Sequence, residues 1–290
     1  MSSQTNPLFE SYFSGIYKKR WAAIRAALVQ PPKQVLRKNK FFGEFTPDEN
    51  LKGCDFLKNC FWKPDSFKLE KNSDGLYNYY VMDPASILVA NSLQVQEGDE
   101  VLDMCAAPGG KSLVLAENNP QSLISNEMSE SRRVRLMRVF HEYIPRDQRD
   151  FVHVKGLDGN QYGLRMPEHF DRVLADVPCS GERHLFENQS ELALWTEKRT
   201  KNLAVRQYSL LSSAWLACKA GGQIVYSTCS ISPIENDQVI QKLIKKRNPE
   251  IIRLPEYESL NFLEKTEHGY QILPDTSNFG PMYFAILKKQ

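Results

Sequence analysis

The stretch EVLDMCAAPGGKS at residues 100–112 decides the fold of this chain. It begins as a short apolar run typical of a strand and passes through a turn that contains Gly109 and Gly110. Helical periodicity then starts near Lys111. Glycine lets backbone N–H groups approach a ligand closely just before a helix begins. The stretch therefore predicts a strand, a ligand-binding turn and a helix.

The same alternation continues along the rest of the chain. Helical periodicity recurs at 111–118, 129–143, 200–219 and 233–247, and it alternates with four more strand-like runs: SLISNE, FVHVKG, FDRVLADVP and QIVYSTC. This pattern is typical of βα units and predicts an α/β fold with a mostly parallel sheet. Two further runs, GYQILP and MYFAILKK, predict an antiparallel pair at the sheet edge.

The N-terminal part has a different character. Residues 8–28 have apolar and basic spacing that predicts one helix, and a loop-rich stretch follows to about residue 75. Against a single acid, Glu10, the first 40 residues hold eight basic side chains: Lys18, Lys19, Arg20, Arg25, Lys33, Arg37, Lys38 and Lys40. This local excess favours a phosphate-bearing partner, and a solvated helix face is the ordinary alternative.

Composition excludes several classes of protein. The chain has 290 residues, 41% of them hydrophobic, which is enough for a full core. Its six cysteines form no CxxC pair, so the sequence predicts neither a disulfide framework nor a metal site, and it favours a reducing compartment.

The sequence also carries expectations about location. It has no apolar run of membrane-spanning length, and the start MSSQTNPLFESYF has the composition of neither a secretory signal nor a mitochondrial presequence. We therefore expect a cytoplasmic monomer that does not bind membranes, with the mitochondrial matrix as the alternative location.

Reactive residue types follow the predicted strands. In open α/β sheets ligands bind beyond the carboxyl ends of the strands, and there this chain places Glu127, Asp158, Asp176, Cys179 and Cys229. Any one carboxylate is more often a loop or cap residue, and a lone cysteine is more often a small buried side chain. Together with the glycine turn, these residues at five strand ends indicate a binding and catalytic site.

Two phosphate-binding motifs compete for the glycine turn, and neither fits. GKS at 110–112 matches the end of a P-loop, but Cys105 stands where the first glycine is needed. The dinucleotide pattern GxGxxG is absent from the sequence. A zwitterionic nucleoside therefore fits better than a triphosphate, with Glu127 at the interval of a ribose-binding acid.

Longer motifs identify a family resemblance. VLDMCAAPGGKS, DVPCSGER and VYSTCSISPIEN resemble the Nop/Sun family of RNA cytosine-5 methyltransferases, and YYVMDPAS and FGPMYF are similar to its subgroup with mitochondrial rRNA and tRNA enzymes. The resemblance implies a Rossmann-like methyltransferase fold with a mostly parallel seven-stranded sheet. It implies a catalytic domain at residues 78–290 and a helical and loop extension at residues 1–77 that binds RNA.

The resemblance also implies a site for S-adenosylmethionine. Glu127 then binds the ribose, Asp158 lies at the adenine, and Arg132 matches a basic position in the cofactor site of some relatives. Asp176 borders the same site. The methionine part is enclosed by seven consecutive residues: Cys105, Ala106, Ala107, Pro108, Gly109, Gly110 and Lys111.

The same resemblance assigns the catalytic residues. Cys229 is the nucleophile, Cys179 assists product release, Asp176 holds the target cytosine, and Lys111 is a possible helper. The chemistry calls for these residue types. A thiolate added to C6 of cytosine makes C5 nucleophilic, and loss of the C5 proton after methyl transfer expels the thiolate. A carboxylate near N3 and the exocyclic amine distinguishes cytosine from uracil.

The sequence thus predicts 5-methylcytidine formation in RNA, with ribosomal RNA as the substrate and transfer RNA as the alternative. The base must leave its stack, which favours single-stranded or flipped cytosines. A non-catalytic RNA-binding assembly factor is a second alternative. A DNA cytosine-5 methyltransferase is a third, but it lacks a counterpart of the second cysteine. The N-terminal segment or a protein partner must select the RNA.

Overall fold

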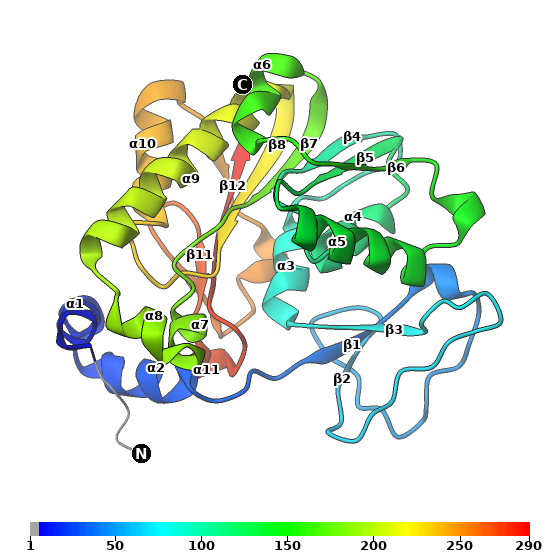
Figure 1. Ribbon diagram of the computed structural model, residues 1–290, viewed down its shortest axis with the longest axis horizontal. Coiled ribbons are helices and arrows are strands. Elements are labelled where there is room, and N and C mark those ends of the chain that lie inside the picture. Colours follow the sequence, from blue (N-terminus) through cyan, green and yellow to red (C-terminus); the bar gives the residue numbers. More distant parts are fainter. Residues whose placement is uncertain (1–5) are drawn as a thin grey trace.

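Five parallel strands lie side by side at the centre of the structure, a computed structural model that describes residues 6–290 (Figure 1). They are arranged in the order β6-β5-β4-β7-β8. Each corresponds to a strand that the sequence predicts, and their bounds are β4 (Glu100–Asp103), β5 (Ser122–Asn126), β6 (Val152–Lys155), β7 (Phe170–Asp176) and β8 (Cys218–Thr228). The predicted α/β fold with parallel strands is confirmed.

Helices cover both faces of this sheet (Figure 1). One layer holds α3 (Pro84–Ser92), α4 (Gly110–Ala116) and α5 (Glu130–Tyr143), and the other holds α6 (Tyr162–Arg165), α9 (Glu197–Ala217) and α10 (Asp237–Arg247). The sequence predicted α4, α5, α9 and α10 and missed the other two. Helix α3 is buried nearly all round, so it has no amphipathic period, and α6 is a single turn.

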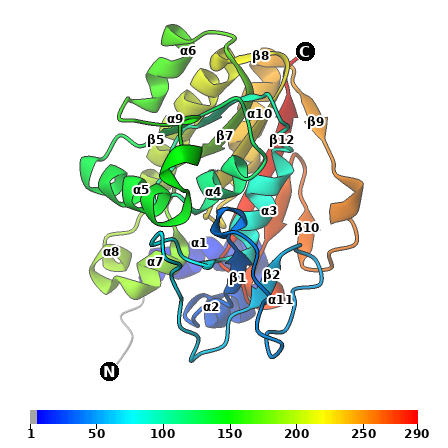
Figure 2. The same cartoon turned by 90° about the vertical axis from the view of Figure 1, so that its right-hand side faces the viewer.

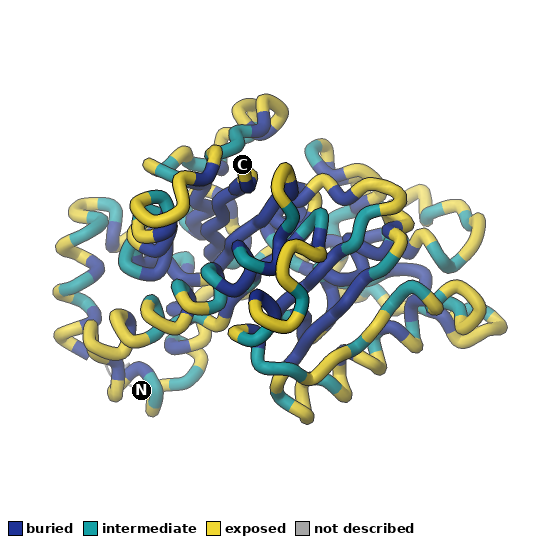
Figure 3. The backbone as a smooth tube through the Cα atoms, turned by 90° about the horizontal axis from the view of Figure 1, so that it is seen from above, coloured by how far each residue is buried: buried dark blue, intermediate teal, exposed yellow. Residues whose placement is uncertain are grey.

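The core has two halves because successive strand residues point to opposite faces of the sheet. Val101 and Leu174 pack on the α3–α5 side, whereas Leu102 and Val173 pack on the α9 side. Seen from above, the buried segments lie in the interior of the structure and the exposed residues lie along its outer coils and loops (Figure 3). Full burial of one such side chain contributes about 1.5–3 kcal/mol.

Antiparallel strands extend the sheet beyond β8. The predicted pair is present, since β11 (Tyr270–Ile272) runs antiparallel to β12 (Met282–Lys288), but β12 also pairs with β8 and is therefore not an edge strand. Two three-residue strands, β9 (Glu250–Ile252) and β10 (Leu263–Lys265), add to it. The sheet consequently has nine strands and not the predicted seven.

A second sheet takes two of its three strands from the stretch that the sequence predicted to be loops. Its three antiparallel strands are β1 (Val35–Lys38), β2 (Cys60–Trp62) and β3 (Tyr79–Met82), with β1 in the middle. Strands of three or four residues are too short to show a reliable alternation. Because β3 follows residue 77, this sheet joins the N-terminal part to the part that carries the site.

The predicted helix at residues 8–28 is broken into two. Helix α1 (Pro7–Tyr17) and helix α2 (Trp21–Leu28) are separated by a 3-10 turn, η1 (Lys18–Arg20), because Lys18 has a left-handed φ of 52°. Phe9 and Phe13 form the buried face of α1, whereas Leu8 is 64% exposed.

The helix pair α1–α2 packs against three short helices, two of which follow the Cys179 motif (Figure 2). Phe9 contacts Trp195 edge to face, with 5.2 Å between ring centroids, and the same cluster includes Leu185 and Ile231. The short helices are α7 (Glu182–Glu187), α8 (Gln189–Ala193) and α11 (Pro274–Ser277). The remaining 3-10 turns are η2 (Lys40–Phe42), η3 (Arg146–Gln148), η4 (Gly159–Gln161) and η5 (Pro255–Tyr257).

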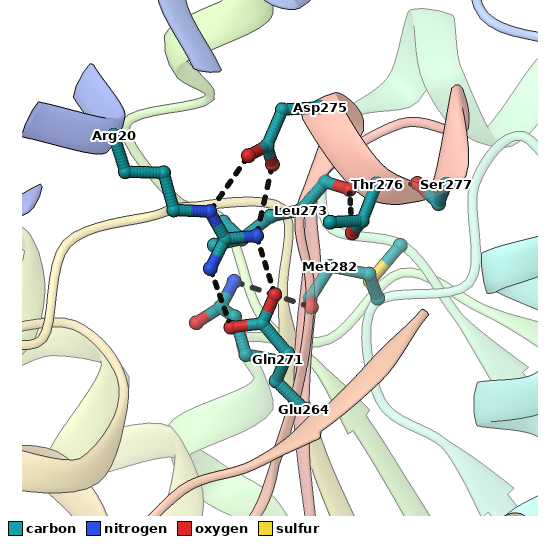
Figure 4. Close-up of polar contacts among 8 residues, drawn as sticks. All are labelled: Arg20, Glu264, Gln271, Leu273, Asp275, Thr276, Ser277 and Met282. Carbon is teal, nitrogen blue, oxygen red and sulfur yellow. Dashed lines mark hydrogen bonds and ion pairs between the residues drawn. The ribbon is translucent and has the colours of Figure 1, made fainter. Parts of the chain in front are cut away.

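Arg20 ties this N-terminal pair to the C-terminal strands (Figure 4). Its guanidinium donates to Asp275 Oδ2 at 2.6 Å and to Glu264 Oε1 at 2.5 Å. These two carboxylates raise the pKa of Arg20 further above its usual value. Arg20 is therefore held by these two carboxylates at a partly exposed position and does not project as part of a free basic face. In the described part of the chain, every helix is too short or too polar to span a bilayer.

Candidate active site

The glycine turn lies where the sheet reverses its strand order. The chain moves outward from β4 to β5 and β6 and then returns to place β7 on the other side of β4. Ligands bind at such a switch point, beyond the carboxyl ends of the strands. Backbone bonds fix the turn there: Met104 N donates to Leu174 O at 2.9 Å, and Ala106 N donates to Asn126 O at 2.8 Å.

Both glycines of the turn are required by packing within the protein. Gly109 has a φ of +118°, and a Cβ there would lie 3.0 Å from Leu136 Cδ1. A Cβ at Gly110 would lie 2.8 Å from Cε1 of Tyr80. The sequence explained these glycines by close approach of a ligand. The structure adds that side chains of α5 and β3 already limit the room at the turn.

Glu127 fits the predicted role at a ribose. The residue is 5% exposed and follows β5; its Oε1 accepts from Ser129 N at 2.9 Å. Its Oε2 is buried without a hydrogen bond, and Arg132 Nη1 lies 3.4 Å away. Arg132 also donates to Ala107 O at 2.8 Å and so connects Glu127 to the glycine turn. A buried carboxylate oxygen that has no hydrogen bond suits the hydroxyl donors of a sugar.

Asp158 behaves mainly as a cap in the structure. Its Oδ1 accepts from Asn160 N at 3.0 Å and from Asn160 Nδ2 at 2.9 Å, which starts the turn η4. This is the ordinary use of aspartate that follows a strand. The adenine role of Asp158 stays a prediction.

The structure adds Asp103, which the sequence reasoning missed. This last residue of β4 is 1% exposed, and its Oδ2 accepts from Ser112 Oγ at 2.6 Å while Oδ1 has no partner. Burial raises the pKa of Asp103 to about 7. The sequence signal that could have identified Asp103 is the position of an acid at the end of the strand that leads into the glycine turn.

Asp176 and Lys111 form an ion pair at the centre of the site. Lys111 Nζ lies 2.8 Å from Asp176 Oδ2, and Ser227 Oγ donates to Asp176 Oδ1 at 2.7 Å. Burial lowers the pKa of Lys111, but Asp176 and Asp103 outweigh this effect and the net shift is upward. Lys111 therefore stays an ammonium, which supports the negative charge of Asp176.

The two predicted cysteines meet in space. Cys179 lies three residues after β7 and Cys229 one residue after β8, and their sulfur atoms are 2.6 Å apart. Cys229 is exposed, and its N–H donates to Cys179 Sγ at 3.2 Å. The contact with Cys229, together with burial, raises the pKa of Cys179 well above its usual value. Cys179 thus remains protonated, and Cys229 is the thiol open to a ligand.

One cavity of about 460 Å³ unites these groups. It is lined by Cys105, Ala107 and Lys111 of the turn, by Arg132 and Asp176, and by both cysteines, and His184 stands at its wall. A smaller cavity of about 220 Å³ continues behind Lys111 to Tyr80 and Asp103. Within residues 6–290, no three His, Cys, Asp or Glu side chains are grouped to hold a metal ion.

Comparison with known proteins shows which family this chain matches. The family described as 16S rRNA methyltransferase RsmB/F matches residues 90–288. The 5-cytosine rRNA methyltransferase NSUN4 of Bos taurus is 40% identical over 228 residues, 73% of this chain and 59% of that protein. The mitochondrial tRNA (cytosine(34)-C(5))-methyltransferase of Mus musculus is 32% identical over 97% of this chain and 89% of its own length.

Solved structures agree on the fold. The crystal structure of NSun6 from Pyrococcus horikoshii with SFG superposes with a TM-score of 0.80 at 16% identity, over 100% of this chain and 99% of that one. A methyltransferase homolog protein from the same organism gives a TM-score of 0.76 at 23% identity, over 98% and 95%.

These findings define a Rossmann-like α/β fold of the methyltransferase type. The chain belongs to the 16S rRNA methyltransferase RsmB/F family, as its motifs predict. It spans 57–61% of the length of four NSUN4 relatives.

Proposed function

We propose that the protein is an S-adenosylmethionine-dependent RNA cytosine-5 methyltransferase that forms 5-methylcytidine. The observation that carries this proposal is the meeting of Cys179 and Cys229, 2.6 Å apart, in one cavity with Asp176 and the glycine turn. Two thiols and a carboxylate at adjoining strand ends supply the nucleophile and the base-reading group of this reaction.

The residues present fit the cofactor. The turn from Cys105 to Lys111 holds its methionine part, and Glu127 Oε2, which has no hydrogen bond within the protein, accepts from its ribose. The cofactor supplies an activated methyl group. Arg132 stabilises the turn through Ala107 O, and Asp103 presents a second unpaired buried oxygen beside it.

Cys229 acts as the nucleophile in this proposal. Its thiolate adds to C6 of cytosine, and the electron pair of the C5–C6 double bond becomes available at C5 for the methyl group. Loss of the C5 proton to a base then restores the double bond and returns the electron pair of the C6–S bond to Cys229. Cys179, whose raised pKa keeps its proton while Cys229 reacts, assists this release.

Asp176 recognises the base. Its Oδ2 is held by Lys111 and its Oδ1 by Ser227, so the carboxylate is fixed before RNA arrives. A fixed acceptor pairs with the exocyclic amine of cytosine and finds no donor at the matching position of uracil.

Ribosomal RNA is the substrate that we propose first, because the NSUN4 relatives are named rRNA enzymes and are up to 40% identical. Transfer RNA is the second candidate, since the mouse tRNA enzyme matches 97% of this chain. That relative is named mitochondrial, so we propose the mitochondrial matrix and not the cytoplasm, which no finding supports. A monomer that uses a protein partner for targeting stays part of the proposal.

The N-terminal extension, residues 1–77, offers a surface for RNA. Arg20, Arg25 and Arg37 each form an ion pair with a carboxylate of the protein itself. A groove of about 570 Å³ instead gathers three lysines, Lys33, Lys52 and Lys63, around Trp62.

Positive charge beside an aromatic ring is the chemistry that binds single-stranded RNA. Replacing Lys33 and Lys63 with alanine is expected to weaken binding to all RNAs and to lower the salt slope by about two units. The matched control replaces Lys245 and Lys246 on α10, and an equal effect there would remove the groove from the proposal.

The two cysteines give the test of the function. Cys229→Ala should lose methyl transfer and still bind S-adenosylmethionine, because only the attacking sulfur is removed. Cys179→Ala should leave methylated RNA attached to Cys229, seen as a denaturation-resistant protein–RNA adduct that the double mutant lacks. Adducts in Cys229→Ala alone would indicate the DNA-type mechanism. No 5-methylcytidine from the parent protein on any RNA would favour the assembly-factor alternative.

A further inference from the structure

A buried pair of carboxylates lies directly behind the two cysteines. Each cysteine is followed by a serine, and the hydroxyl oxygens of Ser180 and Ser230 are 3.1 Å apart. Both hydroxyls contact Glu182 Oε1, at 2.5 Å and 3.0 Å. Both also contact Glu235 Oε1, which lies 3.1 Å from Ser230 Oγ and also accepts from Ser180 Oγ. Glu182 and Glu235 are each 0% exposed.

The second oxygen of each carboxylate holds the opposite loop. Glu235, which follows β8, accepts at Oε2 from the backbone N–H of Ser180 at 3.0 Å, in the loop after β7. Glu182, in the first turn of α7, accepts at Oε2 from the backbone N–H of Ile231 at 2.9 Å, in the loop after β8. The two cysteine loops are therefore joined in both directions. Gln207 Nε2 of α9 also donates to Glu235 Oε2 at 2.6 Å.

Hydrogen counting indicates that this pair keeps a proton. The hydrogen bonds and ion pairs described for the two carboxylates include no lysine or arginine. The two hydroxyl hydrogens can serve at most two of the five contacts among the four oxygens, and a carboxylic proton would supply a third donor. Burial and the charge of Glu235 raise the pKa of Glu182 to about 7.

The surrounding titratable groups also disfavour a second negative charge. Tyr12 and Tyr17 of α1, Tyr226 of β8 and Cys179 face the pair, and each is acidic. Tyr226 donates its O–H to the backbone oxygen of Glu235 at 2.6 Å. No positive group among the described neighbours offsets ionisation of both carboxylates.

We propose that Glu182 and Glu235, which we call the carboxylate clamp, are positioning residues. They set the separation and direction of Cys179 and Cys229 and thereby control release of the methylated RNA. The inference rests on the proposed function. Attack at C6 requires Cys229 alone, whereas release requires the second cysteine at a defined place beside it. Loosening the clamp therefore slows release more than attack, since a misplacement of about 1 Å can cost about 100-fold in rate.

The test compares Glu182→Ala and Glu235→Ala with Glu182→Gln, and uses Glu117→Ala as the control. Glu117 is a partly buried carboxylate, with its side chain 14% exposed, that pairs with Arg37 away from the cysteines. We expect the two clamp alanine variants to slow product release by about 10- to 100-fold and to accumulate the Cys229–RNA adduct. Glu182→Gln keeps a neutral side chain with one donor and one acceptor, and should release product normally.

A pH profile separates positioning from simple loss of stability. Release by the parent protein should slow as the pH rises through about 7, when Glu182 ionises. Release by Glu182→Gln should not slow in this range. If the alanine variants fail to fold, Ser230→Ala removes only one bridging oxygen and should still raise the adduct fraction.

Two outcomes would overturn the inference while leaving the function intact. One is an active parent whose clamp variants lose methylation without any adduct. The other is a pH profile that is the same for the parent and for Glu182→Gln. A parent that makes no 5-methylcytidine would instead contradict the proposed function.

Discussion

Replacing Gly110 with alanine is expected to weaken binding of S-adenosylmethionine by about 5- to 150-fold. The added Cβ would lie 2.8 Å from Tyr80 Cε1 and 3.2 Å from its hydroxyl oxygen. Carbon atoms in contact prefer about 3.5–4.0 Å, so the overlap is roughly 0.7 Å or more. Tyr80 cannot turn away freely because it packs edge-on against Tyr143, with ring centroids 4.9 Å apart. The turn must shift instead, at a cost of about 1–3 kcal/mol.

Calorimetry on four proteins would measure this effect: the parent, Gly110→Ala, Tyr80→Leu and the double variant. The smaller leucine makes room, so the alanine penalty should shrink in the Tyr80→Leu background. Gly15→Ala is the control, because a Cβ at Gly15 meets no atom within 4 Å. Parent-like affinity and thermal stability in Gly110→Ala would refute the reasoning.

Two further predictions concern stability. Arg20→Ala should lower the free energy of unfolding by about 1–2 kcal/mol, and the melting temperature by about 2–4 °C, because it leaves Glu264 and Asp275 without their cation. The control Lys19→Ala should change neither the free energy of unfolding nor the melting temperature. Equal melting curves for the two variants would contradict a stabilising role of the Arg20 ion pairs. Asp103 has a pKa raised to about 7 from 3.8, so the stability it contributes is present below pH 4 and is lost as the pH rises through 7. Denaturant unfolding measures this effect. Between pH 4 and pH 8, the free energy of unfolding of Asp103→Asn should rise relative to that of the parent by about 2–4 kcal/mol. The same difference at both pH values would count against this pKa.

The sequence was informative where structure is local. The strand, turn and helix around Gly109 and Gly110 follow from residues next to one another, and so do the five parallel strands. The cysteines could be assigned to one site because parallel strands bring Cys179 and Cys229 to the same edge of the sheet.

The sequence did not predict the features that depend on partners distant along the chain. Strands of three residues, such as β2, form only through pairing with β1. The break at Lys18 reflects docking of α1 and α2 on α7 and α8, which no local pattern encodes. Glu182 follows PCSG and looks like a surface charge, and it becomes a buried residue only when the loop after β8 covers it.

The docking of α1 on the loop after β8 has a consequence for the order in which the protein matures. Tyr17 donates its O–H to Ile231 O at 2.6 Å, and Tyr12 bonds to Ser232 at 2.8 Å, two residues and three residues after Cys229. Arg20 meets Asp275 only after 255 further residues have been translated. Because contacts of such long sequence separation form slowly, α1 and α2 must wait for partners that are made much later. In a nascent chain the two helices can therefore dock fully beside the loop of Cys229 only after Asp275 has been made.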